Sequence, residues 1–212
     1  MEDETRTDRR VYVACPVMPS PAVTELQGTL VSTFPDVVPC PSDELHVTVG
    51  HVGKAHELRG EIEAIAGTGL DPVAFRESFA RLLDALRACA VPAHDARVTG
   101  LGCFGHARLQ LVATIEHSDS LERGRAHVQR SVVAMLEGLR VPDGERVARG
   151  ARSLELLWPN RFRPHVTLAE WKDGGARAGV GPALARVPMP AAFSMQLGAA
   201  RLEPGAASLS TR

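Results

Sequence analysis

The sequence has little of what marks membrane, secreted or metal-scaffold proteins. None of its apolar runs approaches the roughly 20 residues of a membrane-spanning helix. Its charged opening, MEDETRTDRR, lacks the apolar segment of a secretory signal. Its four cysteines form no C-x-x-C pair and show no spacing typical of a zinc ribbon or a disulfide framework. We therefore expect a cytoplasmic protein that associates with no membrane.

Neither sign of charge dominates, and aromatic residues are few. The 24 basic and 25 acidic residues give a formal net charge of −1, which argues against a histone-like or tail-driven nucleic-acid binder. Aromatic residues make up 4% of the chain, so an extended groove of stacking platforms for single-stranded RNA is not expected. Any anionic ligand must therefore be held locally.

The apolar residues that are present predict strands and helices in alternation. They make up 44% of the 212 residues, which suffices to bury a core. Alternating apolar positions predict strands over residues 11–15, 45–49, 96–104, 108–115 and near 193–202. Apolar positions at helical spacing predict helices over residues 21–34, 71–89 and 118–139. The elements alternate in two comparable halves, with residues 1–10 expected to be disordered.

One tetrad, His-Val-Thr-aliphatic, occurs twice, beginning at His46 in ELHVTV and at His165 in RPHVTL. Side chains alternate between the two faces of a strand. His46 and Thr48 therefore project from one face of the first strand, and His165 and Thr167 project from one face of the second. Each tetrad predicts a half-buried strand that packs its aliphatic residues on helices and presents an imidazole beside a hydroxyl on its other face.

These four polar residues suit acid and base chemistry on a phosphate. An imidazole has an unperturbed pKa near 6.5, so His46 and His165 can share the roles of acid and base at neutral pH. The hydroxyls of Thr48 and Thr167 can donate to non-bridging phosphate oxygens. The pattern indicates in-line opening of a phosphodiester and needs no metal or other cofactor. The competing interpretation of each histidine alone is packing or surface exposure.

Two more histidines follow the first tetrad and invite a metal interpretation, which we consider the weaker one. His51 and His56 come at five-residue steps after His46, without a nearby Asp or Cys partner. His51 also has the opposite parity to His46. It therefore points away from the site unless Gly50 marks a bulge in the strand.

Three other residues are candidates for contact with a ligand. Arg163 shares the parity of His165 and could bind a substrate phosphate through its charged fork, although a surface arginine is nearly as good an interpretation. Tyr12 and Phe104 occur where a base could stack, but aromatic residues in apolar strands are more often part of the core. We expect Arg163 in the site and the two aromatic residues in the core.

The paired tetrads resemble the 2H phosphoesterase superfamily, and within it the bacterial RNA 2′,3′-cyclic phosphodiesterase group historically called 2′-5′ RNA ligases. That family is defined by two H-x-[ST]-x motifs, and further similarity lies in the segments RRVYVACPV, LHVTVGHVG, GLGCFG and FRPHVTLAEW. The resemblance covers nearly the whole chain. It implies an α+β fold: a single domain of two pseudo-symmetric α/β lobes with antiparallel sheets around a central cleft.

The resemblance also implies residue roles and an activity. His46 would protonate the leaving ribose oxygen, His165 would activate water, and Thr48 and Thr167 would bind the phosphate. The implied activity is hydrolysis of 2′,3′-cyclic phosphate ends of RNA or small nucleotides to 2′-phosphates, with reversible ligation as a further possibility, by a monomer without metal. The alternatives are a 2′-5′ oligonucleotide or cyclic-nucleotide phosphodiesterase, and a module that binds terminal RNA phosphates without turnover.

One segment departs from the family pattern. Residues 140–161 look longer than the usual connection before the second motif and add three arginines, Arg146, Arg149 and Arg152. They could extend a rim that contacts RNA, but a solvated charged loop is the preferred interpretation.

Overall fold

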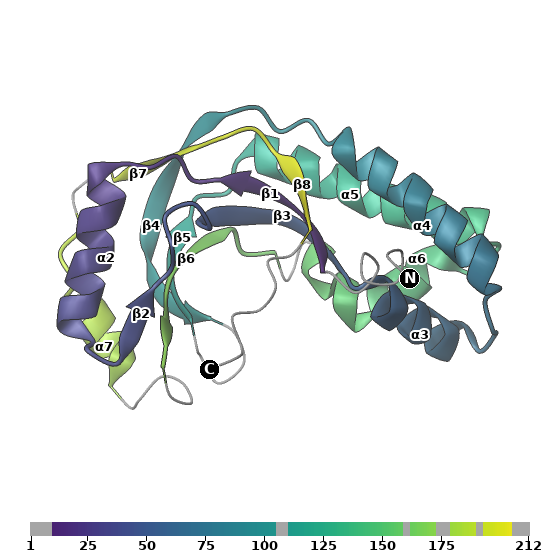
Figure 1. Ribbon diagram of the computed structural model, residues 1–212, viewed down its shortest axis with the longest axis horizontal. Helices are drawn as coiled ribbons and strands as arrows, with labels where there is room; N and C mark the ends of the chain where they lie inside the picture. The colour runs from purple at the N-terminus through teal and green to yellow at the C-terminus, as the bar shows by residue number, and fades with distance from the viewer. Residues whose placement is uncertain (1–9, 105–109, 159–161, 173–178, 190–192, 205–212) are drawn as a thin grey trace, which may run out of the picture.

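A computed structural model describes residues 10–104, 110–158, 162–172, 179–189 and 193–204. The predicted α+β class with antiparallel pairing is confirmed: eight strands form one bent antiparallel sheet, with helices grouped at its two ends (Figure 1). Of the residues 1–10 for which disorder is predicted, all but Arg10 lie outside the described residues.

The strands follow an order that brings distant parts of the chain together. Along the sheet the order is β7-β4-β5-β6-β3-β1-β8, and β2 pairs with β6. Their bounds are β1 Val11–Pro16, β2 Val37–Pro39, β3 His46–Gly53, β4 His94–Phe104, β5 Gln110–Ile115, β6 His165–Trp171, β7 Ser194–Leu197 and β8 Arg201–Pro204.

The helices fall into two groups (Figure 1). One end of the sheet carries α2 (Pro21–Thr33) and α7 (Val180–Leu184). The other end carries α3 (Ala55–Ala66), α4 (Pro72–Arg87), α5 (Asp119–Gly138), α6 (Gly144–Gly150) and the 3-10 helix η2 (Arg152–Leu157). The three helices predicted from the sequence are α2, α4 and α5, and each begins after a side-chain cap: Ser20, Asp71 and Ser118, respectively.

Each end of the sheet draws elements from both halves of the chain, so neither end is built from one consecutive half. Helix α2 lies against β6, where the Gln27 side chain donates a hydrogen bond of 2.8 Å to the carbonyl of Leu168. Helix α5 lies against β3, where Gly124 approaches the Val49 side chain so closely that a Cβ at Gly124 would lie 2.9 Å from it. The sequence alternation alone could not show this exchange.

The strand predicted near residues 193–202 is wrong as a single element. Its residues form β7, which pairs with β4, and β8, which pairs with β1 close to the opposite end of the sheet. Between them the chain crosses β1 at Gly198, whose N–H donates to the Pro16 carbonyl at 2.7 Å. A Cβ at Gly198 would lie 2.9 Å from the Pro16 ring, so this crossing depends on glycine.

The solvated charged loop predicted for residues 140–161 is also wrong within residues 140–158, which form α6 and η2. Val147, Leu154 and Leu157 are buried there. The arginines have local partners: Arg146 pairs with Asp143, and the Arg149 guanidinium lies 4.3 Å from the centre of the Trp158 ring. Leu154 and Leu157, three positions apart, thus hold η2 against β3, and Leu156 between them lines the candidate site. Residues 159–161 lie outside the described residues.

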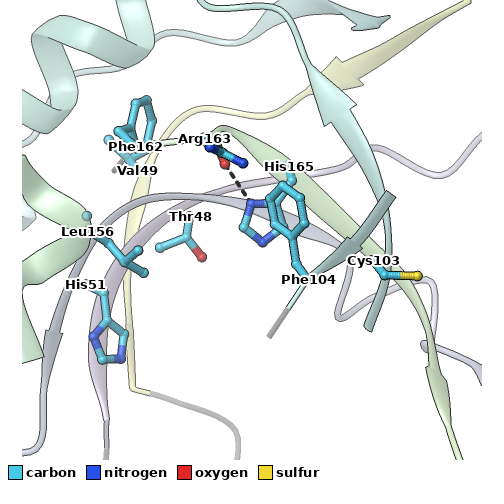
Figure 2. Close-up of a pocket in the computed structure, with 10 residues that line it drawn as sticks. Thr48, Val49, His51, Cys103, Phe104, Leu156, Phe162, Arg163 and His165 are labelled. Carbon is cyan, nitrogen blue, oxygen red and sulfur yellow. Dashed lines mark hydrogen bonds between the residues drawn. The ribbon is translucent and has the colours of Figure 1, made fainter. Parts of the chain in front are cut away.

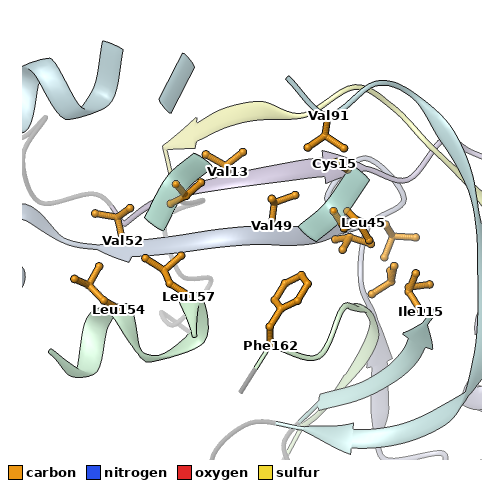
Figure 3. Close-up of a cluster of buried hydrophobic side chains, with 14 of the residues drawn as sticks. Val13, Cys15, Leu45, Val49, Val52, Val91, Ile115, Leu154, Leu157 and Phe162 are labelled. Atoms are coloured by element: carbon orange, nitrogen blue, oxygen red, sulfur yellow. The ribbon is translucent and has the colours of Figure 1, made fainter. Parts of the chain in front are cut away.

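Burial of the aliphatic residues fixes which face each tetrad presents. Val47, Val49, Val166 and Leu168 are all fully buried in one apolar core, part of which Figure 3 shows around Val49. Burying each such side chain stabilises the fold by about 1.5–3 kcal/mol. A slip of one residue would exchange these side chains for the histidines and threonines, so the core determines that the polar residues face outward.

Candidate active site

The two tetrads meet on neighbouring strands. Strands β3 and β6 pair antiparallel with Val47 opposite Val166. One step along this register sets His46 beside Thr167, and one step the other way sets Thr48 beside His165. All four are partly exposed, on the face opposite the buried valines. Residues diagonally opposite in such a pair lie about 7–8 Å apart, so the two histidines flank a space of phosphate size.

Both imidazoles are held by the same kind of hydrogen bond. His46 Nδ1 lies 2.7 Å from the carbonyl oxygen of Glu44, and His165 Nδ1 lies 2.7 Å from the carbonyl oxygen of Arg163 (Figure 2). A carbonyl oxygen only accepts, so each Nδ1 carries a hydrogen and donates it. Nε2 of each ring therefore remains for exchange of a proton with a ligand.

An aromatic ring supports each histidine. Tyr12 on β1 stacks against His46 with ring centroids 5.1 Å apart, and Phe104 on β4 meets His165 edge-on at 4.7 Å. The expectation that Tyr12 and Phe104 belong to the core is wrong, because both are partly exposed and each lines a pocket beside its histidine. Strand parity could have placed these side chains on the polar face once their pairing partners were known.

A bulge at the fourth residue of each tetrad brings a third polar residue to the same face. Opposite β1, the register skips Val49, and opposite β5 it skips Leu168. An extra residue in a strand reverses the alternation beyond it. His51 therefore returns to the face of Thr48, and Glu170 returns to the face of Thr167. From the sequence, the placement of His51 depended on a bulge at Gly50. The bulge lies one residue earlier, at Val49, and has the same effect on parity, so His51 lines the site.

A pocket of about 370 Å³ opens beside His165 (Figure 2). Its polar side chains are Thr48, His51, Arg163 and His165. Its apolar wall comes from Cys103 and Phe104 of β4, from Leu156 of η2, and from Phe162. Arg163 is exposed and reaches this pocket as well as orienting His165 through its carbonyl.

His46 lines a second hollow, of about 280 Å³, on its own side of the site. Tyr12, Arg201 and Glu203 contribute to this hollow, and Arg201 is ion-paired with Glu203. Thr167 lines neither space and stands beside His46 by the strand register alone. The polar residues of the tetrads thus lie between two hollows. One hollow has aromatic side chains in its wall, and the other has charged side chains.

Burial makes His165 a weak proton binder. Desolvation lowers the pKa of His165 below its ordinary 6.5, and the nearby His46 lowers it further when charged, whereas the hydrogen bond to Arg163 opposes both effects. The neutral imidazole is the form that accepts a proton, so His165 is suited to act as a base at neutral pH.

Three further features are absent from the described residues: a metal-binding cluster, a disulfide and a membrane-spanning helix. Among residues 10–104, 110–158, 162–172, 179–189 and 193–204, no group of three or more His, Cys, Asp or Glu side chains could hold a metal ion. The four cysteines are free thiols, two buried and two partly exposed. Within the same residues, no helix is both long and apolar enough to cross a membrane.

No protein-family model and no curated protein matches the sequence. Several solved structures are similar over most of the chain. TT0787 of Thermus thermophilus is 20% identical with a TM-score of 0.46, over 91% of this chain and 83% of that one. E. coli LigT in its apo form is 15% identical with a TM-score of 0.43, over 92% and 86%. The MHV ns2 PDE domain is 14% identical with a TM-score of 0.38, over 92% and 96%.

Proposed function

We propose that this protein is a phosphodiesterase that hydrolyses 2′,3′-cyclic phosphate ends of RNA or small nucleotides to 2′-phosphates. The observation that carries the proposal is the pairing of Val47 with Val166, which gathers both His-x-Thr pairs on one face of the sheet. Two imidazoles with free Nε2 atoms and two hydroxyl donors are the groups that in-line displacement at phosphorus requires.

The roles follow from protonation. His165 Nε2 takes a proton from water as the water oxygen bonds to phosphorus. The bond from phosphorus to the ribose 3′ oxygen breaks, and His46 Nε2 gives that oxygen a proton. The phosphate remains on the 2′ oxygen. Each turnover leaves His165 protonated and His46 neutral, so both return to their starting forms by exchange with solvent.

The threonines and Arg163 handle the charge on the phosphate. Thr48 stands beside His165 and Thr167 beside His46, so each hydroxyl can donate to a non-bridging oxygen next to one of the two proton transfers. Arg163 lines the pocket with an exposed guanidinium that can pair with the phosphate. These roles need no metal ion.

The dimensions favour a short substrate. The pocket beside His165, about 370 Å³, is near the lower end of the range of roughly 300–1,000 Å³ for small-molecule sites. It has room for one nucleoside rather than for several stacked bases. A cyclic phosphate at an RNA end and a free cyclic nucleotide present the same terminal nucleoside to this pocket.

The test is hydrolysis of the four nucleoside 2′,3′-cyclic phosphates in the presence of EDTA. We expect turnover to the 2′-phosphate, and His46→Ala or His165→Ala should each lower kcat by about 10²–10⁴-fold, the usual contribution of one general acid or base. His94→Ala is the matched control, because His94 makes the same kind of Nδ1 contact, 2.9 Å to the Pro92 carbonyl, outside the site.

Three outcomes would overturn the proposal. Binding without turnover would indicate a module that recognises terminal phosphates. Turnover of 2′-5′ dinucleotides alone would indicate the other phosphodiesterase activity. Loss of activity in EDTA with recovery on added metal would contradict the two-histidine mechanism.

A further inference from the structure

The proposed chemistry leaves one histidine of the site without a role. His51 lines the same pocket as Thr48 and His165, on the far side of Thr48 from His165 (Figure 2). It takes no part in the proton transfers assigned to His46 and His165. It therefore borders a part of the pocket that the proton transfers leave free.

The ring of His51 is fixed and its orientation is defined. His51 Nδ1 lies 3.1 Å from the carbonyl oxygen of Ser153, so Nδ1 is the donor. Ser153 is itself anchored, because its N–H donates to the Glu61 carboxylate at 2.9 Å. Gly53, with φ +84, packs against the Ser153 side chain at a position where a Cβ would be 3.0 Å away. The free Nε2 of His51 is thus an oriented hydrogen-bond acceptor.

This acceptor persists at neutral pH. Desolvation lowers the pKa of His51 below 6.5, and the charge of Arg10 lowers it further; the Ser153 carbonyl and Glu57 act in the opposite direction. The neutral ring offers a lone pair at Nε2, whereas a protonated ring would offer a second donor.

The rest of the pocket wall suits a planar ring. Phe104 and Phe162 are aromatic, and Leu156 adds to the apolar surface. The Arg125 guanidinium lies 5.4 Å from the centre of the Phe162 ring, and His117 meets this ring in a T-shaped arrangement. A flat apolar ring with polar groups on its edge fits these walls.

We propose that His51 selects the nucleobase by accepting a hydrogen bond from an exocyclic amino group. Adenine and cytosine carry an amino donor at the position where guanine and uracil carry a keto oxygen. A keto oxygen facing the Nε2 lone pair leaves two acceptors opposed and makes no hydrogen bond. His51 therefore favours adenine and cytosine. The inference rests on the proposed function in assuming that a nucleotide occupies this pocket.

The test measures binding of the products 2′-CMP and 2′-UMP by calorimetry, since binding does not require turnover. The wild-type protein should bind 2′-CMP about tenfold more tightly, the value of one good hydrogen bond. In His51→Asn the shorter amide can still donate to the Ser153 carbonyl but has no group at the position of Nε2. The preference should then fall below about twofold.

Two further variants separate selection from structural damage. In His51→Gln the longer amide can place an oxygen near the position of Nε2 and should restore part of the preference for 2′-CMP. His94→Asn, outside the site, should keep all of it.

Equal wild-type affinity for the two nucleotides would overturn the inference, and so would a preference that survives in His51→Asn. If cyclic nucleotides are then still hydrolysed through His46 and His165, the proposed function stands without it. If neither nucleotide binds the wild-type protein and no cyclic nucleotide is hydrolysed, both proposals fail.

Discussion

The variant Gly50→Ala tests how closely β3, which carries part of the site, packs against α5 and η2. A Cβ at position 50 would lie 2.8 Å from Val128 Cγ1 and 3.0 Å from Leu157 Cδ2, whereas carbon atoms prefer about 3.5–4.0 Å. Both neighbours are fully buried, so they have little space to move into. Overpacking of this kind costs about 1–3 kcal/mol, which we expect as the loss in the free energy of unfolding.

A second substitution turns this loss into a test of the contact itself. Val128→Ala removes the two methyl groups nearest to position 50 and alone costs about 1.6 kcal/mol or more at about 0.8 kcal/mol for each buried carbon. In the double variant the new methyl group occupies the vacated space. The double variant should therefore be more stable than the sum of the single losses predicts, by roughly 1 kcal/mol.

The assay is urea unfolding followed by circular dichroism, with constant m-values as the check for two-state behaviour. The matched control is Gly60→Ala in α3, where a Cβ meets nothing within 4 Å, so that the helix should gain about 0.5–1 kcal/mol. Additive losses in the double variant, or a Gly50→Ala protein as stable as the wild type, would refute the packing argument.

Three other predictions concern His165 in the site and Gln27, which lies behind it. The pKa of His165, followed by NMR, should lie below 6.5. In His46→Ala it should rise, since a charged His46 lowers it, yet it should remain below 6.5 because burial persists. An unchanged pKa would show that the two rings do not interact. The acid limb of kcat/KM should accordingly fall below pH 6.5, as a base loses activity when it is protonated. Gln27→Leu should lower the free energy of unfolding by about 1–3 kcal/mol, because the Cys40 and Leu168 carbonyls both lose a buried donor; a loss as small as that of Gln196→Leu, at an exposed position, would contradict this role.

The local features of the site were accessible from the sequence. Alternation of buried and polar positions placed His46 with Thr48 and His165 with Thr167, because a strand has a period of two and burial of the valines fixes its face. Capping residues such as Asp71 marked where the helices begin. Both the alternation within a strand and the cap of a helix are local signals, because each involves residues only a few positions apart.

The features that the sequence did not reveal depend on distant contacts. The bulge at Val49 reverses the parity of His51, and only the register with β1 shows it. The segment of α6 and η2 is rich in charge, and its few apolar residues become a signal only when β3 lies beside them. Helix α3 was missed for the same reason, although Leu58 and Ile62 have helical spacing and Gly67, with φ +70, ends the helix.

The central claim is that His46 and His165 act on one phosphate. The most direct measurement is kcat for a 2′,3′-cyclic nucleotide in His46→Ala, His165→Ala and the double variant. Residues that act as a unit are strongly non-additive, so we predict that the double variant is no more than about threefold slower than the slower single variant. Losses that multiply in the double variant would contradict a shared site.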